Sequence, residues 1–191
     1  MFLLVDDSLS TSDVGSKLND IRSFITSQPA TVQVGVAYMR NGGALIAQNL
    51  TADHAQAAKA LRLPTGDSGA SASPYFSLQD LLKHWPQGSN AREVIMITDG
   101  GPTVWYEEAL GGWQFAYPSP WAEKQTLLEV QRCTREGITI NTFMLYDDQW
   151  MVAFVNQMAE INHGRTFYAD KNNLGEYLLV DYLNSKRKFI A

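Results

Sequence analysis

The stretch that decides the fold is residues 2–10, which read FLLVDDSLS. Its first part, Phe2-Leu3-Leu4-Val5, is a short and continuous apolar run, which is typical of a strand buried on both faces of a parallel sheet. The run ends at Asp6-Asp7, so acidic side chains follow the strand directly. The sequence therefore predicts a central strand with polar groups at its carboxyl end.

Two further apolar runs, residues 93–98 (EVIMIT) and 138–146 (ITINTFMLY), have the same character. The first ends at Asp99 and the second at Asp147-Asp148. We expect Asp147 and Asp148 to cap the helix that follows them. Since parallel strands place their carboxyl ends at one edge of a sheet, Asp99 is expected at the same edge as Asp6.

Helical periodicity separates the strands, because apolar residues recur three and four positions apart. The helices predicted in this way cover residues 12–27 (Ser12 as N-cap), 51–61 (Thr51 as N-cap), 75–84, 120–135, 149–162 and 172–184. Asn41-Gly42-Gly43 is a hairpin signal between strands predicted at residues 31–39 and 44–48, and a last strand is predicted at 165–168. This alternation predicts an α/β fold, a doubly wound, mostly parallel sheet of the Rossmann-like three-layer type with one antiparallel edge strand.

Composition and charge limit the classes of function that this chain can have. The net charge is −5, and Lys and Arg are scattered until residues 186–188, so no basic face indicates nucleic-acid binding. Cys133 is the only cysteine, which excludes an intrachain disulfide, and no apolar run reaches the roughly 20 residues of a membrane span. No signal peptide precedes the first strand. We expect a single domain over residues 1–191, excised from a longer chain, with exported proteins as one source, and leave its compartment open.

Four side chains are expected to converge at the carboxyl edge of the sheet, where ligands of doubly wound folds bind. Asp6, Ser8 and Ser10 follow the first strand at alternate positions, and Asp99 ends the strand expected beside it. Their carboxylate and hydroxyl oxygens suit Mg²⁺, Mn²⁺ or Ca²⁺, and no His or Cys accompanies them. Because the set carries few charges, the ion keeps waters and can accept a carboxylate from outside. The residues therefore predict a divalent-metal site.

The order of these motifs resembles the von Willebrand factor type A (VWA) domain, in which they build a metal-ion-dependent adhesion site. Asp6, Ser8 and Ser10 match the first motif residue by residue, and Asp99 matches the acidic residue of the later Thr-Asp-Gly. The two motifs occur together with the same element order and hairpin edge strand. The resemblance therefore covers nearly the whole chain.

The family also supplies a threonine from the loop before its third helix, whereas this chain has serines in that region, at Ser71 and Ser73. The resemblance implies that a serine hydroxyl takes this role. Ser73 is favoured because it precedes a proline, with Ser71 as its competitor. The implied metal ligands are thus Asp6, Ser8, Ser10, Ser73 and Asp99.

The function implied by the resemblance is a non-enzymatic, metal-dependent protein-binding module for adhesion or assembly. It uses Mg²⁺, Mn²⁺ or Ca²⁺, and an Asp or Glu of a partner protein completes the coordination. One alternative is a metal-dependent hydrolase or phosphotransferase, which needs a general base or nucleophile that only Asp7, Asp147 or Asp148 offers. Another alternative is a structural VWA domain with a vestigial site.

Asp7 is interpreted as a solvent-facing turn residue. An acidic pair after the first strand also resembles a response-regulator receiver, but residues 44–48 lack the Asp that ends the third strand in that family. Cys133 and the three histidines are expected in packing or surface roles rather than as ligands.

The aromatic-rich segment at residues 105–121 is predicted to be irregular and to lie over the metal edge, since it follows Asp99. Aromatic side chains dominate protein contact sites, so the segment is either a recognition surface or a loop that packs on itself. The sequence leaves both options open.

Overall fold

The computed structural model describes residues 1–9, 14–15, 17–65, 73–86, 91–99, 101–116, 118–145 and 149–168. Six strands form one sheet in the order β3-β2-β1-β4-β7-β8, and within it only β2 and β3 run antiparallel. Their bounds are Phe2–Asp6 (β1), Val34–Arg40 (β2), Gly43–Thr51 (β3), Arg92–Thr98 (β4), Ile138–Met144 (β7) and Thr166–Tyr168 (β8). The predicted fold class is confirmed, including the antiparallel edge strand.

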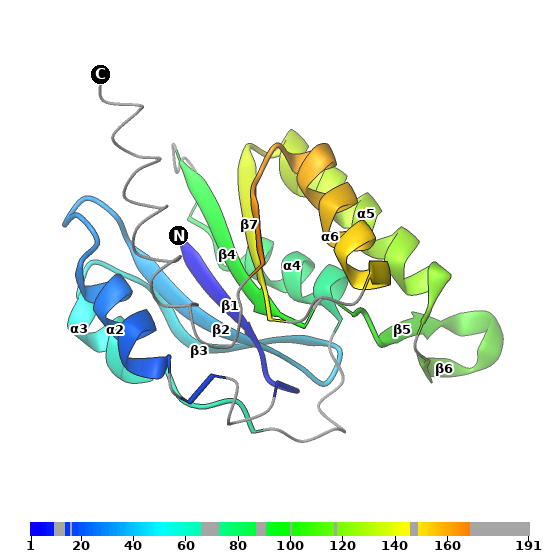
Figure 1. Ribbon diagram of the computed structural model, residues 1–191, viewed down its shortest axis with the longest axis horizontal. Coiled ribbons are helices and arrows are strands. Elements are labelled where there is room, and N and C mark those ends of the chain that lie inside the picture. Colours follow the sequence, from blue (N-terminus) through cyan, green and yellow to red (C-terminus); the bar gives the residue numbers. More distant parts are fainter. Residues whose placement is uncertain are drawn as a thin grey trace.

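Helices cover both faces of this sheet (Figure 1). On one face lie α2 (Leu18–Thr26) and α3 (His54–Ala60), and on the other lie α4 (Pro74–Lys83), α5 (Pro120–Arg135) and α6 (Gln149–Asn162). A hydrophobic core lies on each face of the sheet, and β1 contributes side chains to both. Leu3 and Val5 pack in one core, and Phe2 and Leu4 pack in the other. This two-sided burial explains the continuous apolar run that begins the chain. No helix in the described part of the chain is both long and apolar enough to cross a membrane.

The hairpin signal between β2 and β3 is confirmed. Asn41 and Gly42 both have positive φ angles, 52° and 75°, as a two-residue turn of the mirror-image type requires. A Cβ atom added at Gly42 would lie 2.5 Å from the ring of Trp113, so glycine is also required here by close approach. The return strand is longer than predicted and runs to Thr51.

The cap predicted for α3 is wrong by two residues. Asp53 is the N-cap, and its side chain accepts a 2.9 Å hydrogen bond from the Gln56 N–H. Thr51 instead ends β3, and its hydroxyl accepts a hydrogen bond from the Asp53 N–H at 3.0 Å. The sequence correctly predicts a polar N-cap for this helix, but β3 is longer than predicted and the helix therefore starts two residues later.

The aromatic-rich segment is ordered as a second sheet rather than irregular. It contains β5 (Val104–Glu107), a 3₁₀ turn η1 (Glu108–Leu110) and β6 (Gly112–Phe115), with β5 and β6 antiparallel. The residues from Val104 to Phe115 are called the aromatic hairpin below. The helix predicted at 172–184 and the residues Ser10, Ser12, Ser71, Asp147 and Asp148 lie outside the described residues.

Asn162 joins α5, β7 and α6 at the edge of the large sheet. Its carbonyl oxygen accepts a short hydrogen bond from the Ile140 N–H, at a level of β7 that precedes its pairing with β8. Its amide nitrogen donates to the Ile138 carbonyl and to the Thr134 hydroxyl, both at 2.8 Å. One buried side chain therefore satisfies backbone groups that the short strand β8 does not reach.

Replacing Asn162 by leucine should therefore lower the free energy of unfolding by about 2–3 kcal/mol, because buried polar groups lose their hydrogen bonds. Urea unfolding followed by circular dichroism measures this change. Gln157→Leu places the same side chain on the exposed side of α6 and should change stability by less than about 0.5 kcal/mol. Equal effects of the two substitutions would contradict the role given to Asn162.

Candidate metal centre

Asp6 ends β1 and is fully buried, with both carboxylate oxygens held by hydrogen bonds. Oδ1 accepts from the Ser8 N–H at 3.0 Å and from the Ser8 hydroxyl at 2.6 Å. Oδ2 accepts from the Thr98 hydroxyl at 3.0 Å, and Thr98 ends the neighbouring strand β4. The parallel pairing of β1 and β4 thus fixes the orientation of this carboxylate.

A second carboxylate, Asp99, lies close enough to Asp6 for the two charges to interact. Burial, followed by the charge of Asp99, raises the pKa of Asp6 to about 7, although hydrogen bonds from Ser8 and Thr98 lower it in part. Burial also raises the pKa of Asp99, whose Oδ1 accepts a hydrogen bond from the Gly101 N–H at 3.3 Å. Two carboxylates that resist ionisation together create a site that a cation would stabilise.

Ser73 begins α4 as its N-cap, yet its hydroxyl caps nothing. The residue is fully buried, and its Oγ has no hydrogen-bond partner in the described part of the chain. The Tyr75 hydroxyl lies close enough to Ser73 for its pKa to be influenced, but no hydrogen bond of good geometry joins the two groups. A buried hydroxyl without a partner costs free energy, so an oxygen in this position fits a ligand that a metal ion would satisfy.

The structure brings Asp6, Ser8 and Asp99 together, whereas Ser73 makes no hydrogen bond with them. Ser10 and the competitor Ser71 lie outside the described residues. Within the ranges that are described, no group of three or more His, Cys, Asp or Glu side chains could hold a metal ion. A cation here would therefore rely on two carboxylates and on hydroxyl groups, which are hard oxygen ligands.

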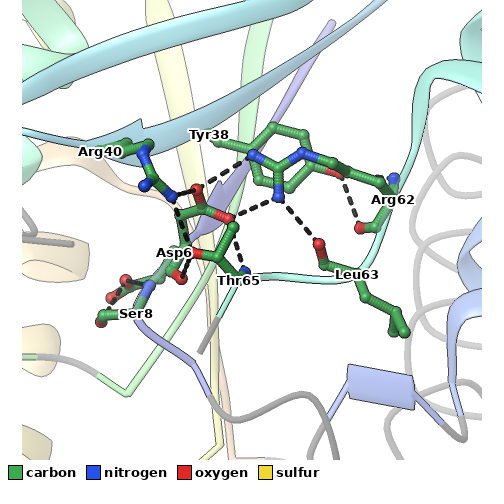
Figure 2. Close-up of polar contacts among 8 residues, drawn as sticks. Asp6, Ser8, Tyr38, Arg40, Arg62, Leu63 and Thr65 are labelled. Carbon is green, nitrogen blue, oxygen red and sulfur yellow. Dashed lines mark hydrogen bonds and ion pairs between the residues drawn. The ribbon is translucent and has the colours of Figure 1, made fainter. Parts of the chain in front are cut away.

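Asp7 is not the solvent-facing turn residue that the sequence suggested. Its side chain is 0% exposed and forms ion pairs with Arg40, at the end of β2, and with Arg62, after α3, both at 2.7 Å. Figure 2 shows the two guanidinium groups converging from these separate segments. Burial alone would raise the pKa of Asp7, but hydrogen bonds from Arg62 and Arg40 outweigh it and hold the pKa below its ordinary value of 3.8.

This cluster fastens the segment after α3 to the sheet beside Asp6. The Thr65 N–H donates to Asp7 at 3.1 Å, and the Thr65 hydroxyl accepts from Arg40 at 2.7 Å. Arg62 also lies over the ring of Tyr38, with 3.9 Å between its Cζ and the ring centroid, and the Tyr38 hydroxyl bonds to the Arg62 backbone on both its N–H and C=O. The chain is therefore anchored at Thr65, eight residues before Ser73.

Sequence reasoning missed three contributors to this edge, namely Thr98, Arg40 and Arg62. The sequence could have revealed Thr98, because it directly precedes Asp99 at the end of a predicted strand. Arg40 and Arg62 had none, because they lie 33 and 55 positions from Asp7 in the chain.

The aromatic hairpin adjoins the start of α4. The Tyr75 hydroxyl accepts a 3.0 Å hydrogen bond from the Tyr106 N–H, and the ring of Trp105 packs at a tilt against Trp121 of α5, with 6.1 Å between ring centroids. Tyr106 and Trp113 nevertheless remain 46% and 45% exposed. The hairpin therefore packs some of its own rings and leaves others exposed to solvent, and its role as a recognition surface stays a prediction.

The chain is similar to known proteins in both its sequence and its fold. The model of the family described as "Rv0959-like protein, vWA domain" matches residues 78–183. The chain is similar to the uncharacterized protein Rv0959 of Mycobacterium tuberculosis (strain ATCC 25618 / H37Rv), with 27% identity over 111 residues. That stretch covers 56% of this chain but only 16% of the relative, so the chain corresponds to a small part of that protein's length.

Two solved structures show the same fold with a metal ion named in their descriptions. The manganese-loaded Plasmodium vivax TRAP protein has a TM-score of 0.63 at 16% identity, covering 95% of this chain and 72% of that one. Proximal thread matrix protein 1 from the mussel byssus, with a zinc-occupied MIDAS motif, has a TM-score of 0.57 at 15% identity, covering 93% and 45%. At these identities the likeness concerns the fold alone.

Proposed function

Because the chain belongs to the family of Rv0959-like VWA domains, we propose that it is a non-enzymatic, divalent-metal-dependent module that binds a partner protein through an Asp or Glu side chain of that partner. The observation that carries this proposal is the pair of carboxylates at the ends of β1 and β4. Burial raises the pKa of both carboxyls and the charge of Asp99 raises that of Asp6 further, and a divalent cation would offset this cost of ionisation.

The residues that would hold the ion are Asp6, Ser8, Ser10, Ser73 and Asp99, some of them through water. When bound, the metal supplies a Lewis-acidic position that an outside carboxylate can fill. Mg²⁺, Mn²⁺ and Ca²⁺ all suit these oxygen donors. Support comes from the buried hydroxyl of Ser73, which has no hydrogen-bond partner among the described residues, and from the two structural neighbours that hold manganese and zinc.

Asp7 supports a binding role over a catalytic one. It is the acidic residue nearest to Asp6 in the chain, and a hydrolase or phosphotransferase would need such a group as general base or nucleophile. Both its oxygens are engaged by Arg40 and Arg62, which hold its pKa below the ordinary value. An acid in this state is a weak base and has no free oxygen to offer.

The test of the proposal is binding of a labelled peptide that contains a single glutamate, measured by fluorescence anisotropy with Mn²⁺ and with EDTA. We expect binding only with Mn²⁺, and loss of binding when the glutamate is replaced by glutamine. A peptide that binds equally well in EDTA, or a protein that takes up no Mn²⁺ in calorimetry, would contradict the proposal.

Two buried serines of α4 offer a matched comparison for the loop ligand. Ser73→Ala should weaken Mn²⁺ binding about tenfold, while leaving the metal-free protein as stable or more stable, since a partnerless hydroxyl is removed. Ser77 donates instead to the Gly43 carbonyl at 2.8 Å, so Ser77→Ala should cost about 1 kcal/mol of stability and leave Mn²⁺ affinity unchanged. Calorimetric Mn²⁺ titration and thermal unfolding give both quantities, and unchanged affinity in Ser73→Ala would exclude Ser73 as a ligand.

A further inference from the structure

The aromatic hairpin presents a row of large apolar side chains to solvent. Tyr106 lies opposite Trp113 and Val104 opposite Phe115, and directly opposed residues share one side of a two-stranded sheet. Tyr106, Trp113 and Phe115 therefore share one face, with Leu110 at the end of the hairpin. Phe115 is 66% exposed and Leu110 is 61% exposed. Of the nine large apolar side chains that are exposed among the described residues, these four lie within one segment.

This exposed face is held in a fixed position by the rest of the protein. The Trp113 ring packs edge-on against Phe76 of α4, with centroids 5.2 Å apart, and also closely over Gly42 in the β2–β3 turn. On the other side of the hairpin, Trp105 packs at a tilt against Trp121. Anchors that are ordered before binding lose little conformational entropy when a partner arrives.

The hairpin is also attached to the segment that holds Ser73, the proposed metal ligand of the loop. Tyr75, whose hydroxyl accepts the hydrogen bond from the Tyr106 N–H, lies two residues after Ser73. In Figure 1 the hairpin stands apart from the large sheet, at the side where β4 ends. Val104, which begins the hairpin, follows Asp99 by five residues, so a segment bound through its carboxylate at Asp6 and Asp99 would have this hairpin near it.

The charged residues of the hairpin itself have one sign. Glu107 and Glu108 lie in the middle of the hairpin, and no Lys or Arg occurs between Asp99 and Lys124. Glu108 is exposed and makes no ion pair in the part of the chain that the structure describes. Acidic groups next to aromatic faces attract Lys and Arg, which gain both from charge complementarity and from contact with the rings.

From this juxtaposition we propose that the aromatic hairpin is the second contact surface of the metal site. Its occupant is a protein segment in which the metal-binding Asp or Glu lies within a few residues of a large apolar side chain and a Lys or Arg. The inference rests on the proposed function, because it names the chemistry of the same partner.

The experiment selects peptides from a library in which each member has one fixed glutamate and five variable residues on either side, in the presence of Mn²⁺. With wild-type protein, we expect enrichment of large apolar residues together with Lys or Arg near the glutamate. The best peptide should bind the Leu110→Ser, Phe115→Ser double variant at least about tenfold more weakly. Glu108→Lys should shift the enriched charged residues from Lys and Arg to Asp and Glu.

A matched control removes two apolar side chains of similar exposure elsewhere, with Leu45→Ser on β3 and Leu128→Ser on α5, which are 50% and 46% exposed. This control should bind the peptide as the wild type does. All the substituted side chains are at the surface, and circular dichroism confirms that each variant is folded.

The outcomes separate the two proposals. Binding that requires Mn²⁺ and the glutamate, but shows no neighbouring preference and survives both hairpin variants, overturns this inference and leaves the proposed function standing. Absence of any Mn²⁺-dependent and glutamate-dependent binding overturns both. If the double variant keeps its peptide affinity and instead loses self-association in ultracentrifugation, or binding to phosphatidylcholine vesicles, the face serves a second copy or a lipid surface and the inference is wrong.

Discussion

Replacing Asp6 by asparagine is expected to abolish divalent-metal binding while making the metal-free protein more stable at pH 8. Asparagine keeps the shape of the side chain, and its amide can donate to the Thr98 hydroxyl while its oxygen still accepts from Ser8. The substitution removes a charge that the fold resists, because burial and Asp99 raise the pKa of Asp6 to about 7. Loss of a charged ligand should weaken Mn²⁺ binding by more than about 100-fold.

The gain in stability has a defined pH window. In the unfolded chain Asp6 loses its proton near its ordinary pKa of 3.8, whereas in the folded protein it keeps the proton up to about pH 7. The folded state therefore binds more protons between these values, and the free energy of unfolding of the metal-free wild type falls as the pH rises through this range. Asp6→Asn has no such titrating group. Its free energy of unfolding should therefore exceed that of the wild type by an amount that grows from pH 4 and reaches up to about 4 kcal/mol at pH 8.

Chemical unfolding at a series of pH values, with EDTA and with Mn²⁺, measures both effects. Mn²⁺ should stabilise the wild type increasingly as the pH rises through 7, since the ion competes with the proton of Asp6, and should leave Asp6→Asn unchanged. Asp20→Asn, at an exposed position of α2, is the control and should match the wild type in both conditions. A metal-free Asp6→Asn protein that is less stable than the wild type at pH 8 would contradict the electrostatic picture of the site.

Replacing Asp7 by alanine should be the most destabilising single change at this edge, with a loss of about 2–4 kcal/mol in the free energy of unfolding. The substitution leaves two guanidinium groups facing each other without their counter-charge and leaves the Thr65 N–H without its acceptor. Arg40 and Arg62 are 27% and 39% exposed, so water screens part of this repulsion and the loss stays below that of a fully buried pair.

Guanidinium unfolding at pH 7 measures this loss, and Lys83→Ala is its control. Lys83 forms an exposed ion pair with Asp80, so its removal should cost less than about 1 kcal/mol. Because the pKa of Asp7 lies below the value of 3.8 expected in the unfolded chain, its contribution is present above about pH 4 and is lost as the pH falls through the folded pKa. The difference between Asp7→Ala and the wild type should therefore shrink in acid, and a difference that is independent of pH would contradict an ionic origin.

The central part of the fold could be predicted because its signals are local. A strand buried on both faces must be continuously apolar, so β1 and β4 were evident, and Asn41-Gly42 marks a turn that requires two positive φ angles. The proximity of Asp6 and Asp99 followed from topology alone, since both end parallel strands that lie side by side.

Other features depend on segments that are distant in the chain. An Asp after a strand is usually exposed, and nothing near Asp7 announces the arginines that make its burial tolerable. The aromatic hairpin could not be predicted for a different reason. Its two strands have four residues each and are too short to show a periodic pattern. Gly111, which precedes β6, and Gly112, its first residue, both have positive φ, and this glycine pair is the turn signal that could have revealed the hairpin.

Three neighbouring aromatic rings beside Ser73, the proposed loop ligand, give the protein an intrinsic optical signal. Trp105 contacts Trp121, and Trp121 contacts Tyr75 with ring centroids 6.4 Å apart, so an unbroken row of chromophores ends two residues from Ser73. Ring pairs at such distances couple electronically and give near-ultraviolet dichroism that depends on their mutual angle. A backbone movement at the start of α4 on cation binding would change the angle between Tyr75 and Trp121, so near-ultraviolet dichroism tests occupancy of the proposed site in the unlabelled chain.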